Sequence, residues 1–399
     1  MAGQALISER LRSGVHAAVE LSTPFYLFDL EAIKQTAFAM AKAWRQEFPR
    51  FTMAYSYKTN ALPGVTTLLR ECGAAAEVVS GAELAAALAD GFAPSQVYFD
   101  GPVKLPSELD QAVALGVLIQ ADSIAEVQAL ADRAVGGACP RVSLRLAVPR
   151  GRRRWSRFGL LPSEVEQARR ILTAADIPVR GIHFNTGLHP LEAEPYRAVL
   201  RHWREQLSDL LAQSAEPLTV DIGGGFPAAS CAPGVPLPPW SVYAKEVAAE
   251  CRALGLPLEA LHLVIEPGRS LVEDHAVLVA SVAVRKPRHR RDVVVLDAGT
   301  NLVRSINGWH HPVEFLQPGN QGSLRYDLYG AMCYESDLFA ARIVGPAGLR
   351  PGDRVIIGAA GGYDIPSANV WVRPRPAVYA LPEFGTEFAR LREPGTDIR

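Results

Sequence analysis

The 399-residue sequence lacks the features typical of proteins that bind nucleic acid or membranes. Its 41 Lys and Arg nearly balance 42 Asp and Glu, so the net charge of -1 gives no reason to expect nucleic acid or an anionic membrane as a partner. No apolar run reaches the roughly 18 residues of a membrane helix. Glu9, Arg10 and Arg12 interrupt the N-terminal segment, so it does not resemble the apolar core of a secretory signal.

Cysteine is scarce, and three common motifs are missing. The five cysteines are widely spaced, without a Cys-x-x-Cys pair or a Cys/His cluster of the zinc type, so we predict no metal site. This cysteine usage fits a reducing, cytoplasmic location best. No Gly-x-Gly-x-x-Gly follows Tyr57, which disfavours a doubly wound nucleotide-binding sheet.

What the sequence does contain is a regular alternation of β-rich and helical segments from Phe51 onward. The predicted strands are 52–57, 75–80, 96–100, 117–121, 141–148, 179–186, 218–222 and 261–266, and the helices predicted between them include one over 195–213. About eight strand–helix alternations over roughly 230 residues match the count and length of a (β/α)8 TIM-like barrel, an α/β fold. Catalytic groups of such barrels gather at the C-terminal ends of the strands.

The pattern changes after about residue 279. Short β-rich pieces, separated by Gly- and Pro-rich turns, follow at 293–296, 355–358 and 370–372. They predict a C-terminal, mainly β domain of the barrel or sandwich type. We therefore predict a barrel domain over 35–279 and a β-rich domain formed by 1–34 together with 280–399.

Three predicted strands end in residues that can carry chemistry. Lys58 follows the first barrel strand, although a lysine alone means little. A later strand runs into Gly223, Gly224 and Gly225, whose backbone N–H groups can surround a phosphate, although such a run is more often only a tight turn. The last barrel strand ends in Glu266-Pro-Gly-Arg269, either a site for an anion or a structural ion pair at a turn.

Taken together, these groups match the needs of pyridoxal 5'-phosphate (PLP). The cofactor requires a lysine for an imine, glycine amides and an arginine for its phosphate, and an acid for its ring nitrogen. A carboxylate facing that nitrogen keeps it protonated, so that the ring can accept the electron pair released when a bond at Cα is cleaved. PLP is therefore the predicted cofactor, with Lys58 as its anchor.

In this order the motifs resemble those of the fold-type III PLP-dependent decarboxylases, which include the diaminopimelate, ornithine and arginine decarboxylases, with the alanine racemase barrel as a more distant relative. The resemblance runs from Thr23 to about Pro376. It implies that Lys58 holds PLP as an aldimine, that Glu266 keeps the pyridine nitrogen protonated, and that decarboxylation passes through a quinonoid. It also implies a homodimer with active sites at the interface.

The resemblance assigns roles to residues that other reasoning would not reach. Cys333 matches the cysteine of a loop that enters the partner's active site, where a thiol can return a proton to Cα, although an isolated cysteine is more often a small core residue. The further residues matched to cofactor binding are Glu77, with Glu83 in the same motif, Arg145, Asn185, Gly268 and Tyr363. The residues matched to substrate binding are Arg304, Tyr334, Glu335 and Asp337.

Several positions depart from the family pattern. Asn185 and Leu188 stand where the family has the histidine that stacks on the ring and a phosphate-binding serine. His183 or His189 could compensate, although each is more often a structural histidine. Tyr334 replaces a family glutamate, and residues 309–312, Trp-His-His-Pro, form a further unusual cluster. The basic run 150–157 is either a solvated loop or a site for an extra substrate carboxylate.

We therefore predict a PLP-dependent carboxy-lyase, an amino-acid decarboxylase. Its expected substrate is a diamino acid, a diaminopimelate-like compound or a carboxylate-bearing derivative, and its expected partner is a second copy of the chain. Two alternatives stay open. A racemase or epimerase of this fold would place an arginine against the ring nitrogen, where this chain has Glu266. A catalytically silent PLP-binding homologue would fit the replacements at Asn185 and Leu188.

Overall fold

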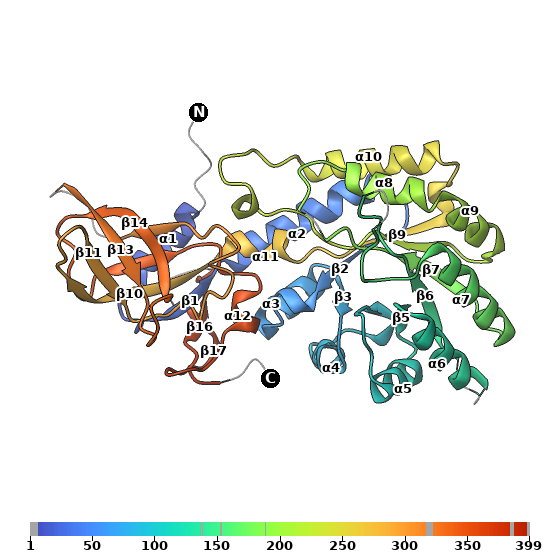
Figure 1. Ribbon diagram of the computed structural model, residues 1–399, viewed down its shortest axis with the longest axis horizontal. Coiled ribbons are helices and arrows are strands. Elements are labelled where there is room, and N and C mark those ends of the chain that lie inside the picture. The colour runs from blue at the N-terminus through green and yellow to red at the C-terminus, as the bar shows by residue number, and fades with distance from the viewer. Residues whose placement is uncertain are drawn as a thin grey trace.

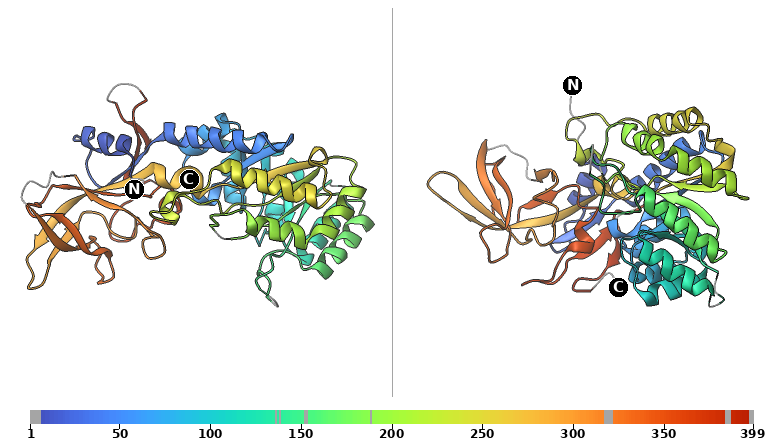
Figure 2. Two further views of the ribbon diagram at one scale, coloured as in Figure 1. Left: turned by 90° about the horizontal axis from the view of Figure 1, so that it is seen from above. Right: turned by 45° about the vertical axis from the view of Figure 1, so that its right-hand side comes forward.

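The protein consists of an α/β barrel joined to a β-sheet lobe (Figure 1). The structure, a computed structural model, describes residues 7–135, 137, 139–151, 154–187, 189–316, 322–383 and 387–396. Helices surround the barrel, and the sheet lobe extends to one side of it, as the two further views also show (Figure 2). Among the described residues, no helix is long and apolar enough to cross a membrane.

The barrel is a closed ring of eight parallel strands. They are β2 (Phe51–Ser56), β3 (Ala75–Val78), β4 (Val97–Phe99), β5 (Leu118–Ala121), β6 (Arg141–Arg145), β7 (Val179–His183), β8 (Leu218–Asp221) and β9 (Leu261–Ile265). β9 pairs back with β2, with Phe51 opposite Leu263, and this pairing closes the ring. Each of the eight predicted barrel strands is confirmed in its predicted place.

Two predicted elements of the barrel end earlier than expected. The strand predicted over 141–148 leaves the barrel after Arg145, because Leu146 and Pro149 form bridges with Leu160 and Trp155 instead. The helix predicted over 195–213 is broken at Trp203, whose buried indole N–H donates to the carbonyl of Ala147 at 3.1 Å. Both differences come from the loop after β6, which the periodicity does not reveal.

Helices surround the ring because each presents an apolar stripe to the strands. They are α2 (Leu30–Arg45), α3 (Pro63–Glu71), α4 (Gly81–Ala89), α5 (Pro106–Leu115), α6 (Ile124–Val135), α7 (Pro162–Ala174), α8 (Glu194–His202), α9 (Arg204–Gln213) and α10 (Trp240–Ala253). In α2, for example, Ile33, Met40 and Trp44 are buried, and Asp29 caps the first turn by accepting from the N–H of Ala32 at 3.1 Å.

The second lobe, called the β-lobe below, is a nine-stranded sheet that accompanies α1 (Glu9–Ala17) and α12 (Asp364–Ser367). Its strands are β1 (Phe25–Phe28), β10 (Ala276–Lys286), β11 (Asp292–Leu296), β12 (Val313–Phe315), β13 (Ser323–Tyr329), β14 (Leu338–Pro346), β15 (Arg354–Ile357), β16 (Ala377–Ala380) and β17 (Ala389–Arg392). β1 lies between β10 and β16, so an N-terminal strand joins C-terminal ones in one sheet. The domain boundaries at 35 and 279 stay a prediction.

The strand expected at 370–372 is wrong, because these residues form an exposed loop. Val372 has a left-handed backbone with φ of 70°, which a strand does not allow. Pro374 and Pro376 follow closely and lack the N–H groups that a sheet requires. Val370, Trp371 and Val372 are therefore more than half exposed, at 57%, 51% and 57%.

The two lobes meet where the first barrel strand ends. The N–H of Tyr363 donates to the carbonyl of Thr59 at 2.6 Å, and the amide of Asn60 donates to the carbonyl of Gly361 at 2.9 Å. A Cβ added to Gly361 would lie 1.8 Å from the carbonyl oxygen of Val272, so only glycine allows this close approach. The turn that carries Lys58 is therefore held from the β-lobe side.

Candidate functional site

Lys58 lies in a short 3-10 turn, Tyr57–Thr59, directly after β2. Its Nζ lies 2.7 Å and 2.6 Å from the two carboxylate oxygens of Glu77, a fully buried residue on β3. Burial raises the pKa of Glu77 to about 7, although the charge of Lys58 opposes this shift. Burial lowers the pKa of Lys58, but the attraction of Glu77 and Glu266 outweighs it and raises the pKa overall. The lysine and its partner thus form a tight pair at the barrel mouth.

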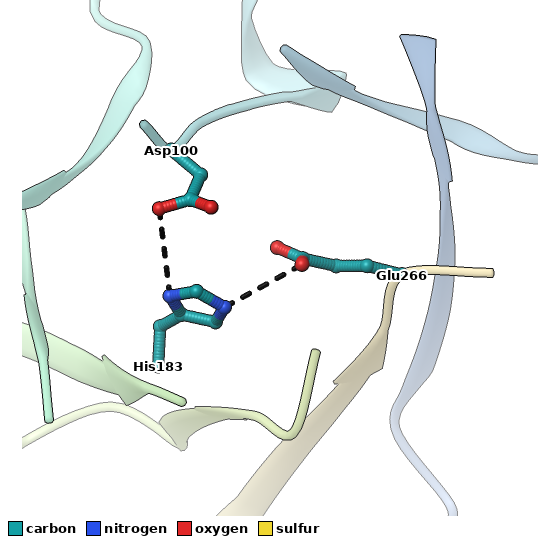
Figure 3. Close-up of side chains that lie close together, drawn as sticks. All are labelled: Asp100, His183 and Glu266. Atoms are coloured by element: carbon teal, nitrogen blue, oxygen red, sulfur yellow. Dashed lines mark ion pairs between the residues drawn. The ribbon is translucent and has the colours of Figure 1, made fainter. Parts of the chain in front are cut away.

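A second cluster joins three strand ends across the barrel mouth (Figure 3). Nδ1 of His183, the last residue of β7, lies 3.6 Å from an oxygen of Asp100, which follows β4. Nε2 of His183 lies 3.4 Å from an oxygen of Glu266, which follows β9. All three side chains are buried. Their ligand-type atoms lie within 4.8 Å of one another, and we interpret the cluster as a chain of ion pairs.

The charges within this cluster are strongly uneven. Burial alone would lower the pKa of His183, but Glu266 and Asp100 raise it to about 9. Burial raises the pKa of Asp100, whereas His183 and Arg145 together lower it to about 2. Burial also raises the pKa of Glu266, and His183 reverses that shift and lowers the pKa below its ordinary value. The histidine is therefore a cation with a carboxylate on either side.

Arg145, the last residue of β6, supports the cluster from its own side. Its guanidinium donates to Asp100 at 2.8 Å and lies 3.2 Å from an oxygen of Asp122. It also lies 4.7 Å from the ring centre of Phe158, while the guanidinium of Arg157 lies 3.9 Å from the same ring. The cofactor contact predicted for Arg145 stays a prediction.

The glycine run after β8 approaches other backbone so closely that side chains are excluded. Gly223 and Gly225 have left-handed backbones, with φ of 71° and 89°. A Cβ added to Gly224 would lie 2.3 Å from the carbonyl oxygen of Glu266, and one added to Gly223 would lie 3.0 Å from Cα and Cβ of Asn185. Asn185 itself accepts from the N–H of Gly187 at 2.9 Å, so its amide stabilises this loop. The neighbouring Leu188 lies outside the described residues.

Arg269 begins α11 (Arg269–Val272) and is clamped between aromatic rings. Its guanidinium lies 3.9 Å from the ring centre of Trp309 and 4.7 Å from that of Tyr363. It forms an ion pair with Glu273, and its Nε is buried without a hydrogen-bond partner among the described residues. The ring of His189 meets Trp309 edge-on at 4.9 Å. A buried cation is thus fixed in orientation three positions after Glu266, whose carbonyl approaches the glycine run.

These groups fit PLP. Several buried polar atoms have no hydrogen bond in the described part of the chain, and they include both carboxylate oxygens of Glu266 and Nε of Arg269. Unsatisfied buried polar groups are costly, and a bound cofactor would relieve that cost. The side-chain-free turn at Gly223 to Gly225 leaves backbone amides for a phosphate, as the cofactor requires. An amine, an anion site and an acid therefore converge on one barrel mouth.

The predicted residues of the β-lobe form a different cluster. Cys333 and Glu335 are exposed and line a cavity of about 660 Å³ with residues of β10, β11 and β13. The hydroxyl of Tyr334 lies 3.1 Å from Oγ1 of Thr300, and its ring stacks on Trp371 at 5.3 Å. Within the described residues, no hydrogen bond, ion pair or ring contact joins these three side chains to the barrel.

Two other residues matched to substrate binding also belong to the β-lobe. Asp337 is buried, and its carboxylate accepts from the N–H and hydroxyl of Thr300 at 2.7 Å and 2.8 Å and from the N–H of Met332 at 2.7 Å. It therefore holds the loop that carries Cys333. Arg304 is exposed. Their roles toward a substrate stay predictions.

Sequence reasoning missed some members of the site. Asp100 ends a predicted strand, so its position after β4 was a signal, yet no motif drew attention to it. Trp309 stood out only as part of an unusual cluster. Asp221 precedes the glycine run, and its carboxylate accepts from Gln120 at 2.7 Å and from the N–H of Gly223 at 2.9 Å.

Comparison with known proteins identifies the family. A family model described as "Pyridoxal-dependent decarboxylase, pyridoxal binding domain" matches residues 35–273, more than half of the chain. The chain belongs to the pyridoxal-dependent decarboxylases. The cofactor is therefore PLP, and the protein is a PLP-dependent carboxy-lyase that decarboxylates an amino acid.

The alignments of this decarboxylase with its relatives cover nearly the whole chain. It is 28% identical to a diaminopimelate decarboxylase of Methanothermobacter thermautotrophicus, over 96% of this chain and 92% of the relative. It is 29% identical to that of Deinococcus radiodurans, over 96% of each chain. The crystal structure of diaminopimelate decarboxylase from M. jannaschii in complex with L-lysine superposes with a TM-score of 0.86 at 25% identity, over 96% of this chain and 92% of that one. These matches confirm the predicted barrel and β domain.

Proposed function

We propose that the substrate of this decarboxylase is an α-amino acid whose side chain ends in a charged group, either a diaminopimelate-like diamino acid or a carboxylate-bearing derivative. The observation that carries the proposal is a set of arginines at the barrel mouth, Arg150, Arg154 and Arg157, which have no acidic partner among the described residues. The curated relatives, which are diaminopimelate decarboxylases, support the diamino acid class.

The position of these arginines supports a role toward substrate. Nη2 of Arg150 lies 3.5 Å from the carbonyl oxygen of Thr186, in the loop that also carries Asn185. Arg157 stacks on Phe158, whose ring also faces Arg145. A guanidinium binds a carboxylate through paired hydrogen bonds, so either side chain would suit the distal end of such a substrate.

In this proposal, each barrel residue holds a different part of the cofactor. PLP, when bound, supplies an electron sink for the pair released as the α-carboxylate leaves as CO2. Lys58 would hold it covalently through Nζ, and Glu77 would hold a proton near that nitrogen. Arg269 and the amides of Gly223 to Gly225 would hold the phosphate, and Glu266 would hold the proton on the ring nitrogen.

We infer that a second copy of the chain completes the site. Cys333 is exposed, and the loop beside it presents Val370, Trp371 and Val372 to solvent. Contiguous exposed apolar residues of this kind mark protein interfaces. In a homodimer, the thiol of Cys333 would reach the barrel of the partner and return a proton to Cα after CO2 has left.

The substrate proposal is tested by measuring CO2 release from diaminopimelate, lysine, ornithine, arginine, diaminobutyrate and their carboxylate-bearing conjugates. We expect turnover of a substrate with a distal carboxylate, and a KM raised at least about tenfold in Arg157→Gln with little change in kcat. Turnover of lysine or ornithine unaffected by Arg157→Gln and Arg150→Gln would contradict the arginine assignment. Racemisation without CO2 release would instead favour the racemase alternative.

A further inference from the structure

His183 is a buried charged residue that has no role in the reaction outlined above. It is fully buried at the end of β7, and each ring nitrogen faces a carboxylate, Asp100 at 3.6 Å and Glu266 at 3.4 Å. Neither nitrogen has a hydrogen-bond partner elsewhere in the described chain. A carboxylate on each side favours the protonated imidazole, because both attract its positive charge.

Glu266 depends on this cation for its own charge. The carboxylate is fully buried, and burial together with the nearby charge of Asp100 favours its neutral form. Asp221 lies on β8 beside it, and burial followed by repulsion from Glu266 raises the pKa of Asp221 well above the ordinary range. Lys58 also attracts Glu266, but it is already paired with Glu77. His183 is thus the main positive charge that holds Glu266 ionised.

We propose that His183 is a positioning residue whose imidazolium, held by Asp100, keeps Glu266 ionised and turned toward the ring nitrogen of PLP. This inference rests on the proposed role of Glu266. The cation acts through Glu266, whose carboxylate would in turn keep the ring nitrogen protonated, so His183 tunes the electron sink without touching the substrate.

The strand register explains why the arrangement is rigid. Arg145 on β6 and Asp221 on β8 lie opposite His183 in the two neighbouring strand pairings. Register partners point to the same side of a sheet, so all three side chains enter the barrel interior together. Arg145 then fixes Asp100 through a contact of 2.8 Å. The titratable groups facing His183 are therefore Asp100, Glu266 and Asp221, with Arg145 and Lys58 behind them.

The test measures the protonation of the cofactor ring directly. Wild type and variants are loaded with PLP labelled with nitrogen-15 in the ring, and protonation of that nitrogen is followed by NMR as the pH is raised. We expect His183→Gln to lower the pH at which the ring nitrogen loses its proton by about one unit or more. Asp100→Asn weakens the charge of His183 but also removes the repulsion between Asp100 and Glu266, so it should give a smaller shift of the same sign. His262→Gln, at the opposite end of a barrel strand, is the matched control and should give none.

Kinetics add a second readout. We expect His183→Gln to lower kcat at least about tenfold with little change in KM, because the ring is tuned while the substrate contacts remain. Loss of kcat with an unchanged ring-nitrogen titration in both His183→Gln and Asp100→Asn would overturn the inference and leave His183 a structural residue. A metal ion recovered from the purified holoenzyme in equal amount to the chain would also overturn it.

A third variant separates failure of the inference from failure of the proposed function. Glu266→Gln cannot ionise, so the ring nitrogen should lose its proton at a lower pH than in any other variant. If Glu266→Gln leaves the ring nitrogen protonated, the proposed role of Glu266 is wrong. If Glu266→Gln removes that proton while His183→Gln and Asp100→Asn do not, only the role of His183 is wrong.

Discussion

The barrel mouth and the Cys333 loop of the β-lobe differ in how many of their functional side chains find partners within one chain. At the barrel mouth, Lys58 pairs with Glu77 at 2.6 Å, and His183 pairs with Glu266 at 3.4 Å. In the β-lobe, Cys333 and Glu335 are exposed and contact none of them. One chain therefore builds a binding place for the cofactor, and we propose that a second chain is needed for the chemistry on the substrate.

The strongest test of the barrel half is removal of its lysine. Lys58→Ala should lower CO2 release by on the order of 10⁴-fold or more, as expected when a covalent anchor is lost. Borohydride should fix PLP to wild type at Lys58 and to nothing in the variant, as read by peptide mass spectrometry. A Lys58→Ala protein that keeps its imine absorbance would contradict the assignment. Lys245→Ala, on the outer helix α10, is the control for loss of a lysine as such.

The next test concerns the Cys333 loop. Cys333→Ala should lower kcat about 10²-fold, because a positioned acid is lost, while PLP affinity stays unchanged. Cys139→Ala, another exposed cysteine, should have no effect.

Mixing then decides whether the site is shared between subunits. When Lys58→Ala and Cys333→Ala chains are refolded together, about a quarter of wild-type activity should return, because half of the dimers are mixed and each has one intact site. No recovery, with mixed dimers demonstrated by mass, would mean that each chain supplies both residues to its own site.

How much of the molecule could be predicted from the sequence depends on whether a feature is local or depends on long-range contacts. The barrel, its eight strands and the strand-end positions of Lys58, Gly223 to Gly225 and Glu266 follow from periodicity and turn residues, which are local properties. The pairing of His183 with Asp100 could not be predicted, because it joins strand ends 83 positions apart and no motif marks Asp100. The clamp of Trp309 on Arg269 is likewise a long-range contact.

Errors in the sequence prediction arose where tertiary contacts override local pattern. Val370 to Val372 have the composition of a strand, yet the following prolines and the backbone of Val372 prevent pairing. Asn185 stands where the family has its ring-stacking histidine, and its side chain accepts from the N–H of Gly187; its contact with the cofactor stays a prediction. Neither could be read from residue type alone.

A smaller effect is expected from filling the phosphate turn. In Gly224→Ala the new Cβ would lie 2.3 Å from the carbonyl oxygen of Glu266, so the backbone must move. Such overpacking costs about 1–3 kcal/mol, and PLP affinity should fall roughly 10- to 100-fold, as measured by fluorescence titration of the apoenzyme. Gly308→Ala has no atom closer than 3.8 Å to its added Cβ and should bind PLP as wild type does. Equal PLP affinity of the two variants would exclude the glycine run as the phosphate site.

The smallest effect is expected within the β-lobe, next to Tyr363, where Asp364 accepts from the N–H and hydroxyl of Ser305 at 3.0 Å and 2.8 Å. Burial raises the pKa of Asp364 to about 6, and the hydrogen bonds of Ser305 oppose the shift. Because the folded state holds this proton more tightly than the unfolded chain, the contribution of Asp364 to stability is full at low pH and is lost as the pH rises through about 6.

Asp364→Asn should remove that dependence. Between pH 4 and pH 7, wild type should therefore lose stability relative to Asp364→Asn. The loss, measured from the urea midpoints of the two proteins, should correspond to about 1–3 kcal/mol. Asp353→Asn, in an exposed turn where the carboxylate accepts from the N–H of Arg350 at 2.6 Å, is the control. A constant difference across this range would show that Asp364 is ionised throughout, and that its contact with Ser305 holds a charge rather than a proton.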